Sequence, residues 1–158
     1  MAKLPTTILC ACGEHFVASY LSGIGLVVAL TRSGVPATDL IVTSEGGGRS
    51  VSLQIKTGGI YSHVTSKRKP GNNAWVWRIG SKAADNSDDS HWYAFVFVGD
   101  WPQGDAIPEI LFVPSKVVAR VVNDPAIQDG WFWMPEAEAE QYRGRRGCEK
   151  LVRVLTKK

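Results

Sequence analysis

The sequence has little cysteine, and its spacing matches neither a disulfide framework nor a zinc finger. The three cysteines, an odd number, are Cys10, Cys12 and Cys148. Cys10 and Cys12 fall within a helical pattern, where residues two apart point about 200° away from each other and cannot hold one zinc ion. We therefore predict three buried thiols in a reducing compartment.

Long hydrophobic runs are also missing. No apolar run approaches ~20 residues, and the chain does not open with a charged segment followed by an apolar signal core. The expected location is therefore the cytoplasm, with no membrane contact. No dinucleotide-binding fingerprint appears either.

Neither sign of charge dominates. Lys and Arg number 18 against 15 Asp and Glu, which gives a net charge of +3, and hydrophobic residues make up 44% of the chain. This mild basic bias permits a nucleic-acid partner without requiring one. A length of 158 residues predicts one domain over residues 1–158, with a core of its own and no separate recognition domain.

Residues 36–56 organise the chain, because two β-type segments there flank a glycine-rich turn. The first segment begins with Asp39 and becomes apolar and β-branched, and residues 51–56 alternate strictly between apolar and polar side chains. Such alternation is typical of a half-buried strand, and the glycines at 46–48 indicate a hairpin turn. These glycines do not form a phosphate-binding loop, since neither a Lys-Ser/Thr pair nor a helix follows them.

Folding the two segments about Gly47 brings the polar residues together. Asp39 comes to lie opposite Ile55, give or take one residue of register. Because side chains alternate across a strand, Gln54 and Lys56 project together on the face that Asp39 can share. A carboxylate, an amide oxygen and an ammonium group then converge at one end of the sheet, where they can bind a cation and a phosphate.

Asp39, the hairpin and Gln54-Ile55-Lys56 together resemble the core motif of the PD-(D/E)XK nuclease superfamily, in its Q-x-K variant. Over roughly residues 5–120, the chain is similar to Holliday-junction resolvases of the archaeal type and to Mrr-like type IV restriction endonucleases. The resemblance implies an α/β fold with a restriction-endonuclease-like core. In that core a mixed central β-sheet is flanked by helices, in the order α-β-β-β-β-β-α.

The resemblance also implies roles for individual residues. A divalent cation, Mg²⁺ or Mn²⁺, would be bound by Asp39, the amide oxygen of Gln54 and the backbone carbonyl of Ile55. Lys56 would orient or deprotonate the attacking water, or stabilise the pentacoordinate phosphate. Gln54 stands where most relatives carry a carboxylate. The superfamily tends to carry a glutamate on the helix before the first strand, and Glu14 fits that place and would restore the missing charge.

The helix that carries Glu14 is expected over residues 5–22, with Gly23 and Gly25 ending it. Steps of three and four from Glu14 reach only apolar or small side chains, which predicts a core-facing stripe: Cys10, Val17, Ala18 and Leu21. An unpaired carboxylate on such a stripe is costly. Glu14 therefore either pairs with an arginine or caps a strand end, or it faces the metal.

Residues 57–90 are the least regular part of the chain and contain two features that suit nucleic-acid contact. Lys67, Arg68 and Lys69 form a basic run, and Arg78 follows a pair of alternating tryptophans. The basic run could grip a DNA backbone or form a solvated turn, and the tryptophans could stack on bases or pack inward. We favour inward packing for the tryptophans.

The C-terminal half is expected to alternate strands and helices: strands over 91–98 and 110–113, a helix over 115–122, an apolar segment over 131–134, a helix from 135, and an edge strand over 151–155. The helix from 135 has Arg143, Arg145 and Arg146 near its end. Cations there suit the helix dipole, and they could equally contact phosphate.

The most direct functional hypothesis is a metal-dependent endonuclease of the restriction, resolvase or repair type, which hydrolyses DNA phosphodiester bonds. Many nucleases of the class that the chain resembles act as dimers so that two strands are cut, and a chain this short is compatible with a homodimer. No motif joins the three histidines to a nucleophile, so no other hydrolase chemistry competes. The alternative is a catalytically inactive module on the same fold that binds nucleic acid or another protein. A third hypothesis is a small phage or mobile-element protein that acts on another nuclease.

Overall fold

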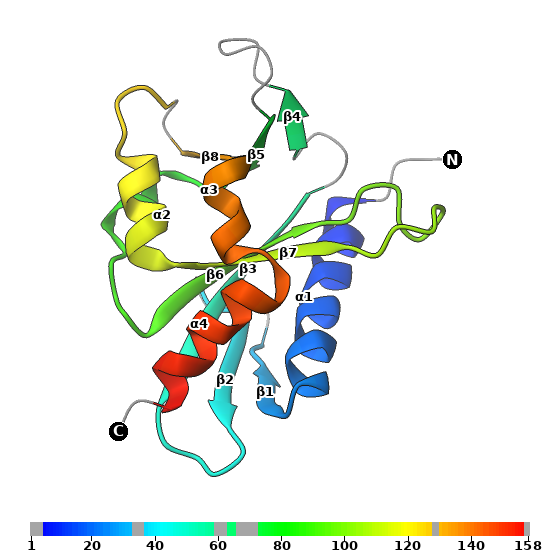
Figure 1. Cartoon of the computed structure of the whole chain (residues 1–158), viewed down its shortest axis with the longest axis vertical. Coiled ribbons are helices and arrows are strands. Elements are labelled where there is room, and N and C mark those ends of the chain that lie inside the picture. Colours follow the sequence, from blue (N-terminus) through cyan, green and yellow to red (C-terminus); the bar gives the residue numbers. More distant parts are fainter. Residues whose placement is uncertain (1–4, 33–36, 59–62, 66–72, 128–129, 157–158) are drawn as a thin grey trace.

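A computed structural model of the chain describes residues 5–32, 37–58, 63–65, 73–127 and 130–156 (Figure 1). In order, the elements are α1 (Thr6–Gly23), β1 (Leu26–Leu30), β2 (Leu40–Ser44), β3 (Ser50–Gly58), β4 (His63–Thr65), β5 (Asn73–Arg78), the short 3₁₀ helix η2 (Ser81–Asp85), β6 (His91–Phe97), β7 (Glu109–Pro114), α2 (Ser115–Val122), β8 (Trp131–Pro135), α3 (Glu136–Ala139), the 3₁₀ turn η3 (Glu140–Tyr142) and α4 (Gly144–Thr156). Among these residues, no helix has the length and apolar character needed to cross a lipid bilayer.

The strands form two sheets. The larger has the order β1-β2-β3-β6-β7, and the smaller has the order β4-β5-β8. Neighbours in the larger sheet run antiparallel, except that β3 and β6 run parallel. The predicted fold class, an α/β fold with a mixed central sheet flanked by helices, is therefore confirmed. The smaller sheet lies outside the predicted order of elements.

Helices α1 and α4 cover one face of the larger sheet. Alternation in β3 turns Leu53 and Ile55 toward this face, where they pack with Val17 and Leu21 of α1 and Leu151 of α4. Burying an aliphatic side chain of this size contributes roughly 1.5–3 kcal/mol. This apolar layer fixes α1 against β3, and α1 is the helix that carries Glu14.

The opposite face of the larger sheet packs on the smaller sheet through aromatic rings. Phe95 of β6 lies 4.9 Å from Trp77 and 4.2 Å from Phe132, measured between ring centroids. Trp75 and Trp77 are only 1% and 4% exposed. The prediction that these two tryptophans pack inward is confirmed, and base stacking by them is excluded because a stacking ring must be accessible.

The C-terminal segment is a helix, so the edge strand predicted over residues 151–155 is wrong. These residues belong to α4, in which Cys148, Leu151 and Leu155 recur three and four residues apart and are buried. Apolar side chains at four of the five positions suit either a strand or a helix. The stripe that begins at Cys148 favours the helix, because it matches the helical period.

The helix predicted to run from residue 135 toward the arginines is divided into α3, η3 and α4. Arg145 and Arg146 therefore lie in the first turn of α4, where the helix dipole disfavours cations, so the dipole explanation is wrong for them. Arg143 precedes α4, and its guanidinium lies 2.5 Å from the Glu109 carboxylate. A phosphate contact by Arg145 or Arg146 stays a prediction.

The prediction of three buried thiols holds for Cys148 alone. Burial, and then the neighbouring Glu149 charge, raise the pKa of the Cys148 thiol to about 11. Cys10 is exposed and Cys12 is partly exposed, and both lie on α1. The core-facing stripe of α1 is thus buried at Val17 and Leu21 but not at Cys10.

Gly13 allows α1 to approach β3 closely. A Cβ atom at Gly13 would lie 1.9 Å from Thr57 Oγ1, a distance that real Cβ atoms essentially never show, and 3.0 Å from Thr57 Cβ, which is a very tight contact. Thr57 is the residue after Lys56 on β3, and Gly13 immediately precedes Glu14. The absence of a side chain at Gly13 therefore sets how near Glu14 comes to the end of β3.

Gly13→Ala is expected to lower the free energy of unfolding by about 1–3 kcal/mol, because the added methyl group forces α1 away from Thr57. Helix propensity alone would raise stability by ~1 kcal/mol. Urea denaturation of Gly13→Ala and of Gly23→Ala, a position with open space around it, measures the difference. Thr57→Ala should recover part of the loss in Gly13→Ala, and equal stability of the two single variants would contradict this close approach.

Candidate functional site

Asp39 is held in place on both sides by backbone hydrogen bonds. Its N–H donates to the carbonyl of Leu53 (2.8 Å), and its carbonyl accepts from the N–H of Thr31 (2.9 Å). Its side chain adds a third bond, because Oδ2 accepts from the N–H of Ile55 (2.6 Å). The Asp39 carboxylate is thus fixed against β3, directly within Gln54-Ile55-Lys56.

The pairing of β2 with β3 confirms the predicted hairpin and its register. Leu40 pairs with Leu53, and continuing that register places Asp39 opposite Gln54. The sequence predicted Ile55 with a margin of one residue. Gln54 and Lys56 are both partly exposed and alternate with buried Leu53 and Ile55. Two of the three predicted polar groups therefore project from the same face of β3, beside Asp39.

Glu14 lies close enough to Asp39 for their charges to interact. Partial burial raises the pKa of the Glu14 carboxyl above its ordinary value, the Asp39 charge raises it further, and His15 opposes the change. In the described part of the chain, Glu14 forms no ion pair with an arginine. The alternative in which Glu14 pairs with an arginine therefore has no support there, and the negative charges of Glu14 and Asp39 oppose each other.

Cys10 belongs to the same group, although the sequence predicted it as a core residue. Burial raises the pKa of its thiol, and the charges of Glu14, Lys56 and Asp39 all act on it, with Lys56 lowering the pKa. Cys10 stands four residues before Glu14, on the same side of α1. This four-residue spacing was the signal in the sequence that Cys10 lies near Glu14. It was not recognised because the other residues of the stripe are apolar or small, which favoured a core position.

His91 and Ser52 form a second polar pair that the sequence did not reveal. The parallel register of β3 and β6 pairs the two residues, and Ser52 Oγ lies 2.8 Å from His91 Nδ1. His91 is 5% exposed. Burial lowers its pKa, while the charges of Asp88 and Asp39 oppose that change. Ser52 precedes Gln54 by two residues, so the polar face of β3 continues from the Asp39 group to His91.

Of the four predicted nucleic-acid contacts, the structure describes only Arg78. Lys67, Arg68 and Lys69 lie outside the described residues. Arg78 is exposed at the end of β5, in the smaller sheet, where it pairs across to Trp131. A DNA contact at any of these four positions stays a prediction.

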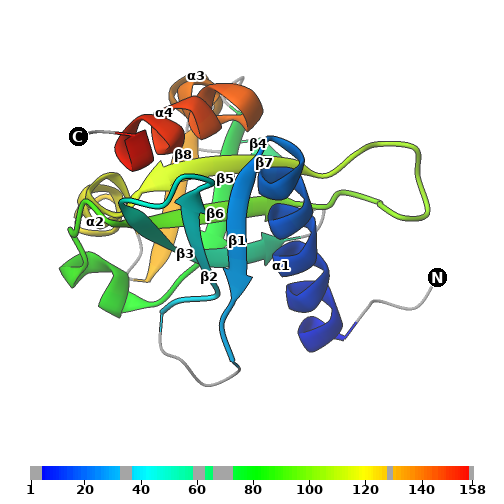
Figure 2. The ribbon, with the colours of Figure 1, turned by 90° about the horizontal axis from the view of Figure 1, so that it is seen from below.

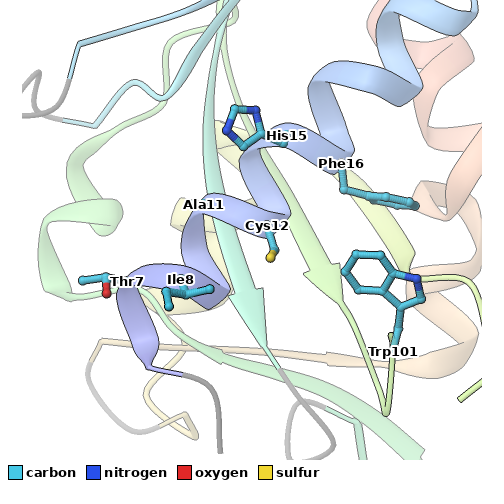
Figure 3. A pocket seen from close by; sticks show the side chains of 7 residues that line it. All are labelled: Thr7, Ile8, Ala11, Cys12, His15, Phe16 and Trp101. Atoms are coloured by element: carbon cyan, nitrogen blue, oxygen red, sulfur yellow. The ribbon is translucent and has the colours of Figure 1, made fainter. Parts of the chain in front are cut away.

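A hollow of about 540 Å³ lies on the outer side of α1, against Trp101 of the loop between β6 and β7 (Figure 3). Both ribbon views show this loop projecting past α1 (Figures 1 and 2). The lining is mostly apolar, with His15 and Cys12 as its titratable groups. The hollow contains neither Asp39 nor Lys56, so it is separate from the candidate site.

The donors around Asp39 suit a hard divalent cation. Among the described residues, no group of three or more His, Cys, Asp or Glu side chains is placed to hold a metal. The set here instead combines the two carboxylates with the amide oxygen of Gln54 and the carbonyl of Ile55. In a strand, the N–H and C=O of one residue point to the same side, so the Ile55 carbonyl faces the Asp39 side. Mg²⁺ needs only a few protein oxygens, because it keeps several waters.

The fold of the chain is similar to that of a solved structure. A bacterial homing endonuclease matches the chain with a TM-score of 0.52 over 96% of this chain and 92% of its own, at 14% sequence identity. At that identity the likeness concerns the fold alone. No protein-family model matches the chain, and no curated protein matches its sequence.

Glu14→Gln should change the pH dependence of stability. Because the folded protein raises the pKa of Glu14 above 4.5, folding favours the protonated carboxyl. The wild type has this contribution below pH 4.5 and loses it as the pH rises through the folded-state pKa. Without metal, the Tm of Glu14→Gln minus that of the wild type should be near zero at pH 4 and positive at pH 7.

The matched control is Glu45→Gln, an exposed position in the turn between β2 and β3. Its Tm difference should not follow the same course. A Glu14→Gln difference that stays constant from pH 4 to pH 7 would show that Glu14 does not interact with Asp39.

Proposed function

We propose that the chain is a metal-dependent endonuclease that hydrolyses DNA phosphodiester bonds, with a site of the PD-(D/E)XK type in its Q-x-K variant. The observation that carries this proposal is the bond from the Ile55 N–H to the Asp39 carboxylate. It joins the two halves of the motif at one point of the sheet. The fold likeness to a homing endonuclease supports the same class of activity.

The residues that would hold Mg²⁺ or Mn²⁺ are Asp39, Gln54, Glu14 and the backbone carbonyl of Ile55. The cation, when bound, would supply charge stabilisation at the phosphate and an activated water. Asp39 and Glu14 provide the negative charge. Gln54 contributes an uncharged oxygen, so the site depends on Glu14 more than a site with a second strand carboxylate would.

Lys56 is the group proposed to act on the substrate. It projects from β3 next to Asp39 and makes no ion pair among the described residues, so its ammonium is available to a phosphate. It would orient or deprotonate the attacking water, or stabilise the charge that develops on the phosphate. Its position two residues after Gln54 puts it on the same face as the amide oxygen.

A homodimer in which each copy cuts one strand is part of the same proposal. Among the described strands, β1 pairs only with β2, and its other edge is open. Val27 and Leu30 on β1 are about half exposed. An open edge with exposed apolar side chains is a surface on which a second strand can pair.

Lys56→Ala should lower the rate of DNA cleavage by at least ~100-fold, because the positioned ammonium is lost. The assay follows nicking of supercoiled plasmid and cleavage of a four-way junction with Mg²⁺ or Mn²⁺. Lys82→Ala, which removes an exposed cation in η2, is the control and should cleave as the wild type does. Binding of DNA by the wild type with no cleavage under either metal would favour the inactive binding module instead.

Asp39→Asn should abolish metal binding while keeping an oxygen that accepts from the Ile55 N–H. A ligand at 100 times its Kd stabilises a fold by about 2.7 kcal/mol. We therefore expect Mn²⁺ to raise the Tm of the wild type and of Asp85→Asn, an exposed control, but not that of Asp39→Asn. An equal rise in all three proteins would place the metal elsewhere.

A further inference from the structure

A cleft of about 550 Å³ lies at the opposite end of β3 from Asp39, and its walls come from four parts of the chain. The turn between β2 and β3 contributes Arg49, the start of α2 contributes Lys116, and α4 contributes Lys150 and Arg153. Asp89, in the loop before β6, is the one carboxylate in its lining. We call this the basic cleft.

The ratio of positive to negative side chains is higher in the basic cleft than in the chain as a whole. Four cations face one carboxylate there, whereas the whole chain has 18 cations and 15 acids. Asp89 neutralises Lys116, with 3.1 Å between them. Arg49 and Arg153 are exposed and form no ion pair among the described residues. The cleft therefore carries a net positive potential that an anion would relieve.

Lys150 is held in position rather than free in solvent. Its Nζ donates to Gln141 Oε1 (2.8 Å) and lies 4.4 Å from the centre of the Tyr142 ring. Partial burial, and then the charge of Arg153, lower the pKa of Lys150. The two neighbouring cations Lys150 and Arg153 thus repel each other in the cleft.

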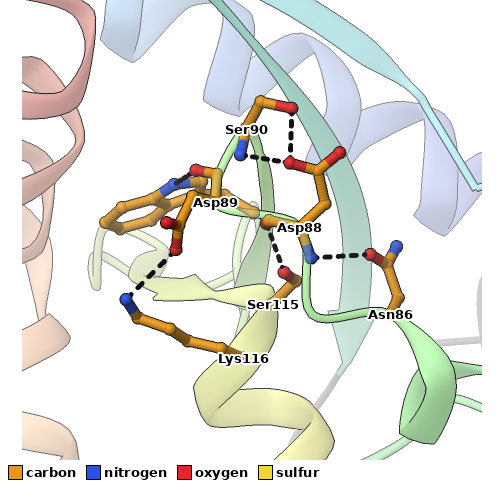
Figure 4. A network of polar contacts seen from close by, with 7 residues as sticks. Asn86, Asp88, Asp89, Ser90, Ser115 and Lys116 are labelled. Carbon is orange, nitrogen blue, oxygen red and sulfur yellow. Dashed lines mark hydrogen bonds and ion pairs between the residues drawn. The ribbon is translucent and has the colours of Figure 1, made fainter.

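The wall formed by the loop before β6 is fixed by a polar network (Figure 4). The Asp88 carboxylate accepts from both N–H and Oγ of Ser90 (2.8 Å each), and Ser115 Oγ donates to the Asp88 carbonyl (2.6 Å). Trp92 Nε1 donates to the Asp89 carbonyl (3.3 Å). The network ties the loop to the start of α2, so the two walls keep their spacing.

Arg49 of the basic cleft lies far along β3 from Lys56. Arg49 precedes β3, and Lys56 follows it by seven residues, which corresponds to about 23 Å along an extended strand. Successive phosphates on one strand of DNA advance ~3.4 Å along the helix axis. The separation therefore corresponds to about seven base steps.

We propose that the basic cleft binds backbone phosphates of DNA, as a contact region separate from the bond that is cut. This inference rests on the proposed nuclease function, because that function supplies a polyanion long enough to reach both places. Backbone contacts of this kind position a duplex without reading its sequence. Free phosphate or pyrophosphate has the same chemistry, and the test separates the two sources.

The test measures the binding of a labelled 20-base-pair duplex by fluorescence anisotropy, without divalent metal and at several salt concentrations. Arg49→Gln/Arg153→Gln should bind about tenfold more weakly than the wild type near 0.1 M salt. The slope of log K against log salt should become shallower by about two, since each lost phosphate contact removes roughly 0.9. The control Lys82→Gln/Arg120→Gln removes two exposed cations elsewhere, Lys82 of η2 and Arg120 of α2, which pairs with Glu138. It should keep both the affinity and the slope.

An unchanged affinity and slope in Arg49→Gln/Arg153→Gln would overturn the proposal, as would an equal loss in the control. Arg153→Glu is a second variant, and it should weaken binding further by repelling phosphate. Circular dichroism melts check that each variant is folded. In a separate titration with pyrophosphate, binding that depends on Arg49 and Arg153 in a protein that does not bind DNA would assign the cleft to a free anion and overturn the DNA contact.

Failure of this inference is distinguishable from failure of the nuclease proposal. If cleavage depends on Lys56 but DNA binding does not change on mutation of Arg49 and Arg153, the nuclease proposal is supported and the proposed role of the cleft is wrong. Binding that depends on the two arginines, with no cleavage under either metal, would keep the cleft and remove the catalytic proposal.

Discussion

The hydrogen bond from the Ile55 N–H to the Asp39 carboxylate stands where the next backbone rung of the β2–β3 ladder would be. A side chain thus replaces a backbone acceptor, and the Ile55 N–H stays paired beyond the last backbone pair of β2 with β3. Beside this bond, Gln54 and Lys56 are partly exposed on the polar face of β3. Helix α1 packs on the other face of β3, where Gly13 meets Thr57 without a side chain.

Charge is arranged unevenly around this frame. At one end of β3, Glu14 and Asp39 repel each other, and at the other end the cations of the basic cleft do the same. Both arrangements cost stability in the isolated chain, and each would be relieved by a ligand of the opposite sign. A metal cation beside Glu14 and Asp39 and a phosphate backbone across the basic cleft could be bound at the same time. A nucleic acid with its metal ion supplies both the positive and the negative charge that the two ends of β3 would need.

The hairpin and the placement of Asp39 against β3 were predictable because their signals are local. Alternation in residues 51–56 and the glycine turn determined the register to within one residue. The sequence-based prediction was wrong where a hydrophobic pattern suits two kinds of secondary structure, as in α4. It was incomplete where a contact depends on pairing between strands that are far apart in the sequence. The pairing of β5 with β8 built the smaller sheet, and that of β3 with β6 brought Ser52 to His91. Neither strand pairing can be predicted from the pattern of neighbouring residues in the sequence. Cys10 was missed because an apolar stripe need not be buried along its whole length.

The parallel pairing of β3 with β6 also bears on the order in which the chain can fold. Ser52 and His91, which meet across it, are 39 residues apart, whereas β1, β2 and β3 follow one another and pair through short connections. Closing a long loop costs more entropy than closing a short one, and non-local contacts slow folding. The three-strand meander can therefore form before β6 joins it. Since Asp39, Gln54 and Lys56 all lie in or beside the meander, the strand part of the candidate site can assemble without β6.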